Sequence, residues 1–429
     1  MLVEDEYSLL IAVSVILLFS FFFGEVSKRT SIPSVLMLIV LGIVINLGIE
    51  SFIQPAKPYD WAPILKTIGV VGLIMIVLEA ALELELKPEK YIPIAKAFGI
   101  ALIGLVLSTW VAALALEKFI PEMDMARAWV YATPISILSS AIIIPSVTDL
   151  RPFKKEFHIY ESTFSDILGI ILFYFLTGQF EGDAAHGGGH STGALSYIGT
   201  IVLTVLISLV ASYLIVLIFQ NIKSHVKLFL LIAVLLLLYA VGKKMHLSSL
   251  IIILVFGLLI ANMRLFFVGP LKKMLQYKKA LHIYEGLHVI TMETAFVVRT
   301  FFFVIFGITI DLASLASLEV AVISLFIIAS IYIIRYVILR LFLGKDIFPQ
   351  LFVAPRGLIT ILLFIAIPEA AQTESFEGGI LLFVIIGTSL IMTIAMIVNK
   401  NRTNVAIKKA ENNTVGSHQW TAPTIEVEP

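Results

Sequence analysis

The chain has no cysteine, and only 14% of its 429 residues are charged. The absence of cysteine excludes disulfide bonds, thiol catalysis and thiolate metal sites. Acidic and basic residues balance to a formal net charge of +0, which argues against a nucleic-acid partner, because proteins that bind nucleic acids carry basic surfaces. Hydrophobic residues make up 59% of the sequence. No soluble domain hides that much apolar surface, so the composition predicts a polytopic membrane protein.

Apolar runs long enough to cross a bilayer as a helix, which takes roughly 20 residues, recur along the whole chain. The N-terminus is acidic and lacks the basic region of a signal peptide, so the first run is expected to stay in the mature protein. The pattern predicts an all-α polytopic membrane protein with about thirteen transmembrane helices. The segments are 7–24, 32–49, 62–82, 93–116, 125–147, 159–178, 197–219, 227–241, 247–263, 287–310, 319–341, 349–368 and 379–398. The eighth is short enough to be tilted or to merge with the ninth.

Lysine and arginine concentrate in every second loop, and such loops face the cytoplasm. The opposite loops carry few basic residues: Lys57, Lys118, Lys243 and Lys244. This asymmetry predicts a multi-pass protein of the cell (inner) membrane, with its N-terminus outside and its C-terminus in the cytoplasm. The outer loop Gln179–Ser196 contains His186 and His190 without further ligands, so a flexible polar loop is favoured over a metal site. Residues 399–429 are predicted to form a disordered cytoplasmic tail.

One acidic cluster, the segment Glu161–Asp166, precedes an uncharged apolar run that continues to the end of the sixth span. A carboxylate inside a transmembrane helix costs ~2.5–3.5 kcal/mol to insert, so it marks a functional site by default. Helical spacing places Ser162 and Asp166 on one stripe, and Glu161 and Ser165 on the adjoining stripe. Two carboxylates and two hydroxyls on one side of a helix suit a hard cation or a proton.

Proline lies near the middle of two predicted spans, the fifth and the twelfth, at Pro134 and Pro355. Proline removes a backbone donor, and an unwound helix at membrane depth is tolerated where it is buried in protein or lines a cavity. Each proline alone also fits a simple kink, but broken helices at matching positions of two halves are typical of a transporter site. The third and tenth spans also end alike, in alternating acidic and aliphatic residues. These pairings predict two inverted six-helix repeats, spans 1–6 and 8–13, with broken helices 5 and 12 crossing and span 7 as the connector.

Several more charged residues lie within predicted spans, away from the span ends: Glu79, Glu293, Arg299, Arg335 and Arg356. Unpaired charges would be prohibitive there, so most of them are expected to pair. Arginine stays charged and binds carboxylates as a fork, which suits permanent structural pairs. At least one acid is left to load and unload. Asp166 is the candidate, because it lies deepest in its span with Ser162 and Ser165 as neutral oxygen donors.

The Glu161–Asp166 segment and the apolar run after it resemble the Glu-Ser-x-x-Asn-Asp helix of the cation/proton antiporter superfamily, the sodium/proton exchangers. Leu78–Leu84 resembles the acidic motif of the family's third helix. Leu138–Pro145 resembles the broken fifth helix of its potassium-efflux branch. Arg335 stands where the family has a basic residue in the eleventh helix, and the Arg-Gly pair at 356–357 resembles a motif of its broken twelfth helix. The resemblance covers nearly the whole chain.

The resemblance implies a site centred on Asp166, which would bind Na⁺ and the proton in turn. Ser162 would be a side-chain ligand, and backbone carbonyls near Thr133 in an unwound stretch would complete the shell. Two structural ion pairs are also implied: Glu161 with Arg335, and Glu79 near Arg356. The cargo would be monovalent cations and protons, with no cofactor.

The resemblance further implies an elevator mechanism in a homodimer. Residues 1–92 and 227–310 would hold the scaffold and dimerisation helices. Residues 93–178 and 319–398 would form the moving core, and the helix at 197–219 would link the halves.

The chain departs from the family pattern at three places. Ser165 stands where the family has Asn or Asp, and an Asp there accompanies electrogenic exchange, so electroneutral exchange is favoured. The Thr-Asp-Pro of the family's fifth helix reads Ala-Thr-Pro at 132–134, and the missing acid bears on ion selectivity. Arg299 is an extra charge in the tenth span, with either Glu293 or Glu161 as its partner.

The sequence therefore predicts an antiporter, not an enzyme, that exchanges Na⁺ or Li⁺ for H⁺. Exchange of K⁺ for H⁺ on the same scaffold stays open, because one aspartate with neutral oxygens does not fix the size of the cation. A cation channel would need a continuous polar stripe, and a symporter of organic anions is disfavoured by the acidic cluster. An intramembrane enzyme would need a nucleophile with an adjacent base, and the sequence shows no such pair.

Overall fold

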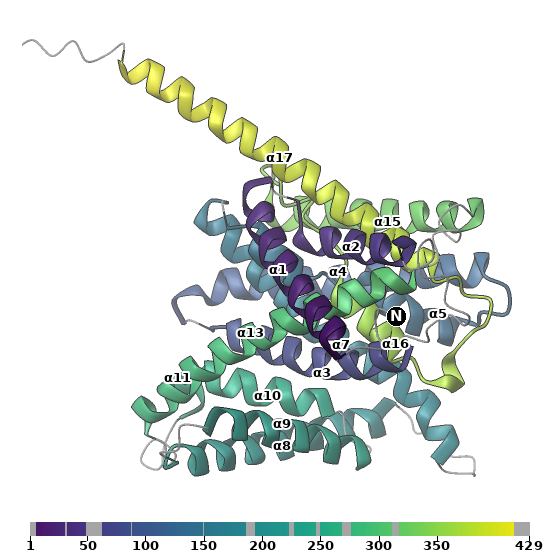
Figure 1. The fold of residues 1–429 in the computed structure, drawn as a ribbon, viewed down its shortest axis with the longest axis vertical. Coiled ribbons are helices and arrows are strands. Elements are labelled where there is room, and N and C mark those ends of the chain that lie inside the picture. The colour runs from purple at the N-terminus through teal and green to yellow at the C-terminus, as the bar shows by residue number, and fades with distance from the viewer. Residues whose placement is uncertain are drawn as a thin grey trace, which may run out of the picture.

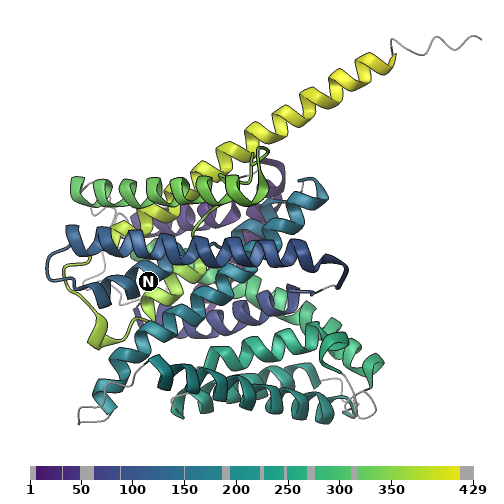
Figure 2. The same cartoon turned by 180° about the vertical axis from the view of Figure 1, so that it is seen from behind.

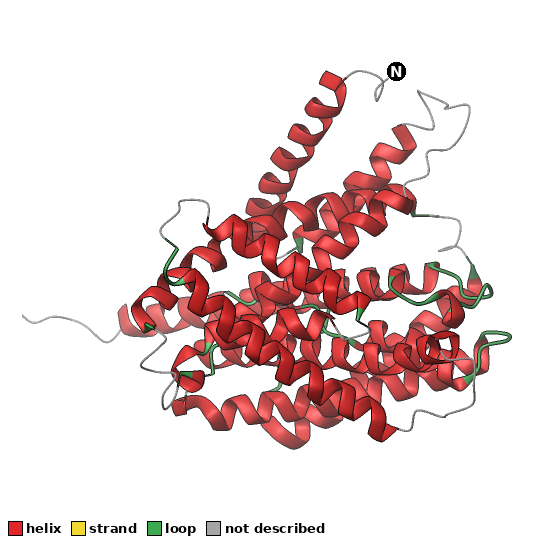
Figure 3. Ribbon diagram, turned by 90° about the horizontal axis from the view of Figure 1, so that it is seen from below, coloured by secondary structure: helices red, strands yellow, loops and turns green. Residues whose placement is uncertain are grey.

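The structure, a computed structural model, describes residues 6–30, 32–48, 62–86, 88–148, 150–185, 194–222, 227–245, 249–267, 276–310 and 317–415. Every regular element in these ranges is a helix (Figure 3). The α-helices are α1 (Glu6–Thr30), α2 (Ser34–Gly48), α3 (Ala62–Glu83), α4 (Tyr91–Phe119), α5 (Met125–Ser136), α6 (Ser140–Ser146), α7 (Pro152–Ala185), α8 (Ala194–Phe219), α9 (Lys227–Lys244), α10 (Ser249–Ala261), α11 (Met263–Phe266), α13 (Tyr277–Thr309), α15 (Leu318–Leu343), α16 (Leu358–Ile365) and α17 (Gly379–Val415). Two short 3₁₀ helices are η2 (Pro88–Lys90) and η3 (Glu369–Ala371).

The predicted all-α membrane fold is confirmed. Within the described ranges, eight helical stretches are long and apolar enough to cross a membrane, and α2 and α10 are shorter apolar helices. Each predicted segment overlaps at least one helix, and the eighth and ninth segments form separate helices, α9 and α10. The number of spans and the inverted repeat stay predictions.

Long helices form here because a bilayer offers no water to satisfy backbone N–H and C=O groups, which must therefore pair within each segment. The buried face of α4 carries small residues, among them Ala97, Ala101 and Ala112. Small side chains let neighbouring helices approach closely. α5 begins where the Asp124 carboxylate accepts a hydrogen bond of 2.7 Å from the Arg127 amide, which satisfies one of the free donors at the helix start.

The helices pack as two groups. α4, α5, α6, α7, α15, α16 and α17 form one group, and α1, α2, α3, α8, α9, α10 and α13 form the other. In Figure 1, α8, α9 and α10 lie together at one end of the body, and α15 lies at the opposite end. The view from behind shows α4 running across the middle of the molecule (Figure 2). The two groups meet mainly where α3 contacts α7 and α16, with smaller contacts of α1 with α6 and of α10 with α7. The candidate site lies beside the contacts of α3.

Two predicted spans are interrupted. In the fifth, α5 ends at Ser136 and α6 begins at Ser140. In the twelfth, residues 353–357 have no regular secondary structure and α16 begins only at Leu358. Thr133 lies in the last turn of α5, so its predicted place in the unwound stretch is wrong by one turn. Pro134 is accommodated inside α5, and the chain leaves the helix only after it.

α17 continues to Val415 and projects well beyond the body of the molecule (Figure 1). The prediction of a disordered tail from residue 399 is therefore wrong for residues 399–415. The stretch 406–411, Ala-Ile-Lys-Lys-Ala-Glu, is rich in good helix formers, and a helix that has already started propagates through such residues easily. The predicted outer-loop histidines, His186 and His190, lie outside the described residues.

Candidate functional site

The two irregular stretches that interrupt the fifth and twelfth spans, residues 137–139 and 353–357, cross and bond to each other. The Ser139 amide donates to Pro355 O at 3.0 Å, and Arg356 Nε donates to Ile135 O at 2.7 Å. Helix ends leave backbone amides and carbonyls without helical partners, and here each stretch supplies partners for the other. The crossing therefore ties α5, α6 and α16 into one unit, although these helices come from opposite halves of the chain.

Arg356 is buried and contacts backbone rather than an acid. Its Nε bonds to Ile135 O at 2.7 Å, and its Nη1 bonds to Ala354 O at 3.2 Å. Ile135 lies in the last turn of α5, which is the negative end of that helix, so the guanidinium is a favourable cation at a helix C-terminus. The expectation that Glu79 lies near Arg356 is corrected by the structure, which pairs Glu79 with Arg299.

Gly357 has no room for a side chain. A Cβ placed there would lie 2.7 Å from Ser139 Oγ and 2.7 Å from Ile142 Cδ1. We expect Gly357→Ala to push the two stretches apart and to lower the free energy of unfolding by about 1–3 kcal/mol, the usual effect of overpacking. The measurement is the melting temperature in detergent, with tryptophan fluorescence as the signal that monitors unfolding. Gly378→Ala is the matched control, because its Cβ would meet nothing within 4 Å, and equal melting temperatures for both variants would contradict the tight crossing.

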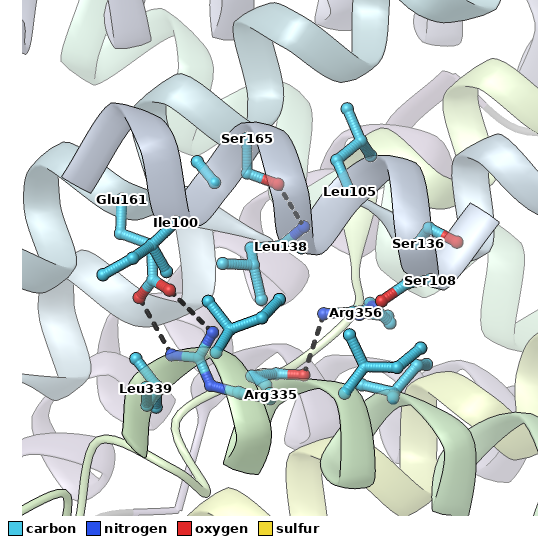
Figure 4. A pocket seen from close by; sticks show the side chains of 16 residues that line it. Ile100, Leu105, Ser108, Ser136, Leu138, Glu161, Ser165, Arg335, Leu339 and Arg356 are labelled. Atoms are coloured by element: carbon cyan, nitrogen blue, oxygen red, sulfur yellow. Dashed lines mark hydrogen bonds and ion pairs between the residues drawn. The ribbon is translucent and has the colours of Figure 1, made fainter. Parts of the chain in front are cut away.

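Glu161 and Arg335 form a buried ion pair between α7 and α15. Arg335 Nη1 lies 2.7 Å from Glu161 Oε1, and Nη2 lies 2.9 Å from Oε2, which is the forked geometry of a strong pair (Figure 4). Arg335 also donates to Gln350 O, through Nε at 3.1 Å and Nη2 at 3.0 Å. The pair that the resemblance implies is therefore present in the structure, and it commits Glu161 to a permanent partner.

A buried histidine, which the sequence reasoning missed, adjoins this pair. His158 Nδ1 lies 3.4 Å from Glu161 Oε2 without the geometry of a hydrogen bond, and the side chain has no exposed surface. The spacing of three residues puts both side chains on one face of α7, and that spacing was the signal in the sequence. Glu161 is thus enclosed by two nitrogen-bearing side chains, Arg335 and His158.

Asp166 lies on the same helix in a different environment. Its exposed fraction is 1%, and neither carboxylate oxygen makes a hydrogen bond of ordinary geometry with the described residues. The hydroxyl and amide of Ser140, at the start of α6, face the carboxylate. Sequence reasoning missed Ser140, although it belongs to the stretch 138–145 that drew attention as a broken helix. A buried carboxylate without an opposite charge beside it is strongly unfavourable when ionised, so Asp166 is suited to take up a proton or a cation.

Two of the predicted oxygen donors bond back to their own helices. Ser162 Oγ donates to His158 O at 2.7 Å, and Thr133 Oγ1 donates to Trp129 O at 2.8 Å. Each bond uses the hydroxyl proton and leaves the oxygen lone pairs unused. Ser162 precedes Asp166 by four residues on α7, so the two side chains share one stripe of the helix.

Ser165, the third predicted donor, supports the interruption of the fifth span. Its Oγ accepts a hydrogen bond of 3.0 Å from the Leu138 amide, as Figure 4 shows. With Glu161 and Arg335 it lines a cavity of about 30 Å³, which has room for about one water molecule. Its oxygen satisfies an amide that the broken helix leaves free, so Ser165 has a structural role here, and its role as a cation ligand stays a prediction.

A larger cavity, of about 230 Å³, lies between the two helix groups. Glu79 and Glu83 of α3 and Arg299 of α13 form one side of its wall. Ser140 of α6 lies on the other side, so the cavity ends at the residue that faces Asp166.

Arg299 has a partner that the sequence did not suggest. Its Nη2 lies 3.2 Å from Glu79 Oε1, across the contact between α13 and α3. The expectation that Glu293 or Glu161 is the partner is therefore wrong. Glu293 occupies an exposed position on α13, and Glu161 is held by Arg335.

A model of a known protein family matches the amino-acid sequence of nearly the whole chain. The model, described as "Sodium/hydrogen exchanger, transmembrane", covers residues 13–400. The chain belongs to the sodium/hydrogen exchanger family. This exchanger is therefore a cation/proton antiporter by family, which confirms the predicted superfamily and makes it a transporter. No curated protein sequence matches this exchanger.

Solved structures share the fold of this exchanger. The sodium proton antiporter MjNhaP1 from Methanocaldococcus jannaschii, in a structure at pH 8, matches with a TM-score of 0.65 and 18% sequence identity, over 92% of this chain and 99% of that chain. An electron-microscopy structure of the same antiporter matches with a TM-score of 0.62 and 18% identity, over 99% of this chain and 100% of that chain. At this identity the likeness shows the fold.

Proposed function

We propose that this exchanger carries Na⁺ in exchange for H⁺, and that both ions bind in turn at Asp166. The observation that carries the proposal is the Asp166 carboxylate, which is almost fully buried and makes no hydrogen bond of ordinary geometry within the described part of the chain. Such a carboxylate is stable only when a proton or a cation neutralises it. Glu161 does not fit this role, because Arg335 already neutralises it.

Coupling follows from the energy of the empty site. With a proton or Na⁺ bound, Asp166 is close to neutral and the part of the protein that holds it can move. The bare carboxylate costs several kcal/mol to carry through the barrier, so an empty site stays where it is. One ion must therefore replace the other before the return movement.

The proposed shell for Na⁺ combines one carboxylate with neutral oxygens. Ser162 shares a stripe of α7 with Asp166, and Ser140 faces the carboxylate from α6. The last turn of α5, which includes Thr133, offers backbone carbonyls without helical partners. Because the site has one negative charge, one Na⁺ would replace one H⁺, and we propose electroneutral exchange.

We propose an elevator movement of one helix group against the other. The group that holds α7, α5, α6 and α16 would be the moving core, and the group that holds α3 and α13 would be the scaffold. The most extensive helix contacts lie within each group, and the groups meet mainly where α3 contacts α7 and α16, which suits a movement of one group as a unit. The proposed assembly is a homodimer in the cell membrane, with the N-terminus outside and the C-terminus in the cytoplasm.

The test is a proteoliposome assay in which an imposed pH gradient is followed by fluorescence dequenching. We expect added Na⁺ or Li⁺ to dissipate the gradient, and K⁺ to have little effect. An imposed membrane potential should leave the rate unchanged, because an electroneutral exchange moves no net charge. Liposomes without protein provide the control.

Two outcomes would change the assignment. A response to K⁺ alone would replace the proposed cargo with K⁺ on the same scaffold. A cation current that does not move protons would indicate a channel and would contradict antiport at Asp166.

A further inference from the structure

A hydrogen bond joins the two helix groups at the end of α3. Tyr160 Oη, on α7, donates to Glu85 O at 3.2 Å, just after α3 ends. The Tyr160 side chain has an exposed fraction of 7%, so little water competes for this bond. A second bond between the groups, from Lys400 Nζ to Arg29 O, is longer, at 3.4 Å, and exposed. The bond from Tyr160 is therefore the stronger of these two attachments.

The acceptor of this bond belongs to a segment that its own helix group holds in place. Asn262, which follows α10, donates to Leu84 O at 2.7 Å. Tyr284 of α13 donates to Leu82 O at 3.2 Å. α10 and α13 both pack on α3, so these bonds persist when the other group moves. Tyr160 reaches the same segment from the group that holds the ion site, so its bond depends on how the two groups are placed.

The proposed elevator movement has to break the bond between Tyr160 and Glu85. Such a bond holds only while donor and acceptor lie about 2.7–3.2 Å apart. A slide of α7 past α3 by a single helical turn, about 5.4 Å, would leave the hydroxyl without this acceptor. The bond therefore stabilises the arrangement of this structure and not the alternate arrangement.

The cavity beside the ion site shows which side this arrangement serves. The cavity of about 230 Å³ extends from Ser140 along α6 to Pro145 and Thr148, which are exposed. The chain after α6 carries Arg151, and the chain after α3 carries Lys90. Basic loops face the cytoplasm, so in the proposed orientation the cavity leads from the ion site to the cytoplasm.

We propose that Tyr160 is a positioning residue that holds the exchanger in the state open to the cytoplasm. This inference rests on the proposed exchange at Asp166 and on the proposed movement. One neutral hydrogen bond shifts an equilibrium between two states by roughly threefold to tenfold. The apparent affinity for an ion scales with the fraction of the protein in the state that can bind it. The Tyr160 hydroxyl therefore lowers the apparent affinity for Na⁺ that arrives from outside.

The experiment measures the apparent KM for Na⁺ of Tyr160→Phe in inside-out and right-side-out membrane vesicles. Phenylalanine keeps the ring and removes only the hydroxyl, and the melting temperature in detergent checks that the variant is folded. For Na⁺ on the outer side we expect KM to fall roughly threefold to tenfold, because the state open to the outside gains population. For Na⁺ on the cytoplasmic side KM should not fall.

Tyr284→Phe is the matched control. It removes a hydrogen bond of the same length, 3.2 Å, to the same segment at the end of α3, but both partners belong to one helix group. We expect this variant to keep the wild-type KM on both sides, because the bond that it loses is present in both states.

An unchanged outer KM in Tyr160→Phe would overturn this inference and leave exchange at Asp166 standing. A fall in KM on both sides, or an equal fall in Tyr284→Phe, would also overturn it. Absence of cation-dependent proton movement in the wild type would instead refute the proposed function itself.

Discussion

Asp166→Asn is expected to abolish Na⁺-dependent proton movement while the protein still folds. The amide has the shape of the carboxylate but neither binds the transported proton nor neutralises Na⁺, so the site can no longer alternate between two neutral states. The fold should tolerate the change, because the Asp166 oxygens make no hydrogen bond of ordinary geometry within the described ranges that the substitution would break. Proteoliposome dequenching gives the rate, and the melting temperature in detergent gives the stability.

The matched control for this prediction lies on the same helix. Glu156→Gln removes a partly exposed acid of α7 that pairs with Lys90 at 2.5 Å, and such surface pairs contribute about 0–1 kcal/mol. We expect this control to exchange ions at nearly the wild-type rate. Retained Na⁺-dependent proton movement in Asp166→Asn would remove Asp166 from the proposed role.

Arg335→Ala is expected to destabilise the protein by about 3–5 kcal/mol, because it strands the buried charge of Glu161. The guanidinium also holds Gln350 O, so the variant loses the attachment of the irregular chain before α16 as well. The measurement is thermal unfolding of the purified protein in detergent. A fall in melting temperature should accompany a lower yield of folded protein, since marginal stability sets the folded fraction in cells.

Two further variants distinguish the effect of breaking the Glu161–Arg335 ion pair from the general effect of removing an arginine. Arg340→Ala removes an exposed arginine from the same helix, α15, and should leave the melting temperature nearly unchanged. The double variant Glu161→Leu with Arg335→Met should recover much of the lost stability, because a buried pair replaced by apolar residues leaves no unpaired charge. Single and double variants that melt alike would show that the stranded charge is not the cause.

The membrane-spanning helices, and the helix α7 that carries Asp166, could be predicted from the sequence because each follows from a local property of the chain. Apolar length alone predicts a membrane span, and each predicted segment overlaps a helix. The segment 161–166 stood out because carboxylates inside a span are costly. The fork between Glu161 and Arg335 was implied by the resemblance and agrees with the preference of arginine for permanent pairs.

The remaining features depend on contacts between distant parts of the chain, which no local rule supplies. Arg299 pairs with Glu79 across 220 residues of sequence, and only the packing of α13 on α3 makes that choice. The break in the fifth span falls after Ser136 because the following residues find partners elsewhere, such as Pro355 O for the Ser139 amide. Pro134 misled the prediction, since a proline near the end of a helix need not be where the helix stops.

The buried ion pair between Glu161 and Arg335 affects how the chain is inserted into the membrane during synthesis. Glu161 and Arg335 are separated by 174 residues, and Arg356 and the Ile135 carbonyl by 221. While the ribosome is still translating, the earlier half therefore enters the bilayer with a carboxylate and a helix end whose partners do not yet exist. The translocon, or water that it admits, has to solvate these groups until the later half is inserted. A nascent chain released before α15 would leave Glu161 without its counter-charge, which makes truncated products natural targets of membrane quality control.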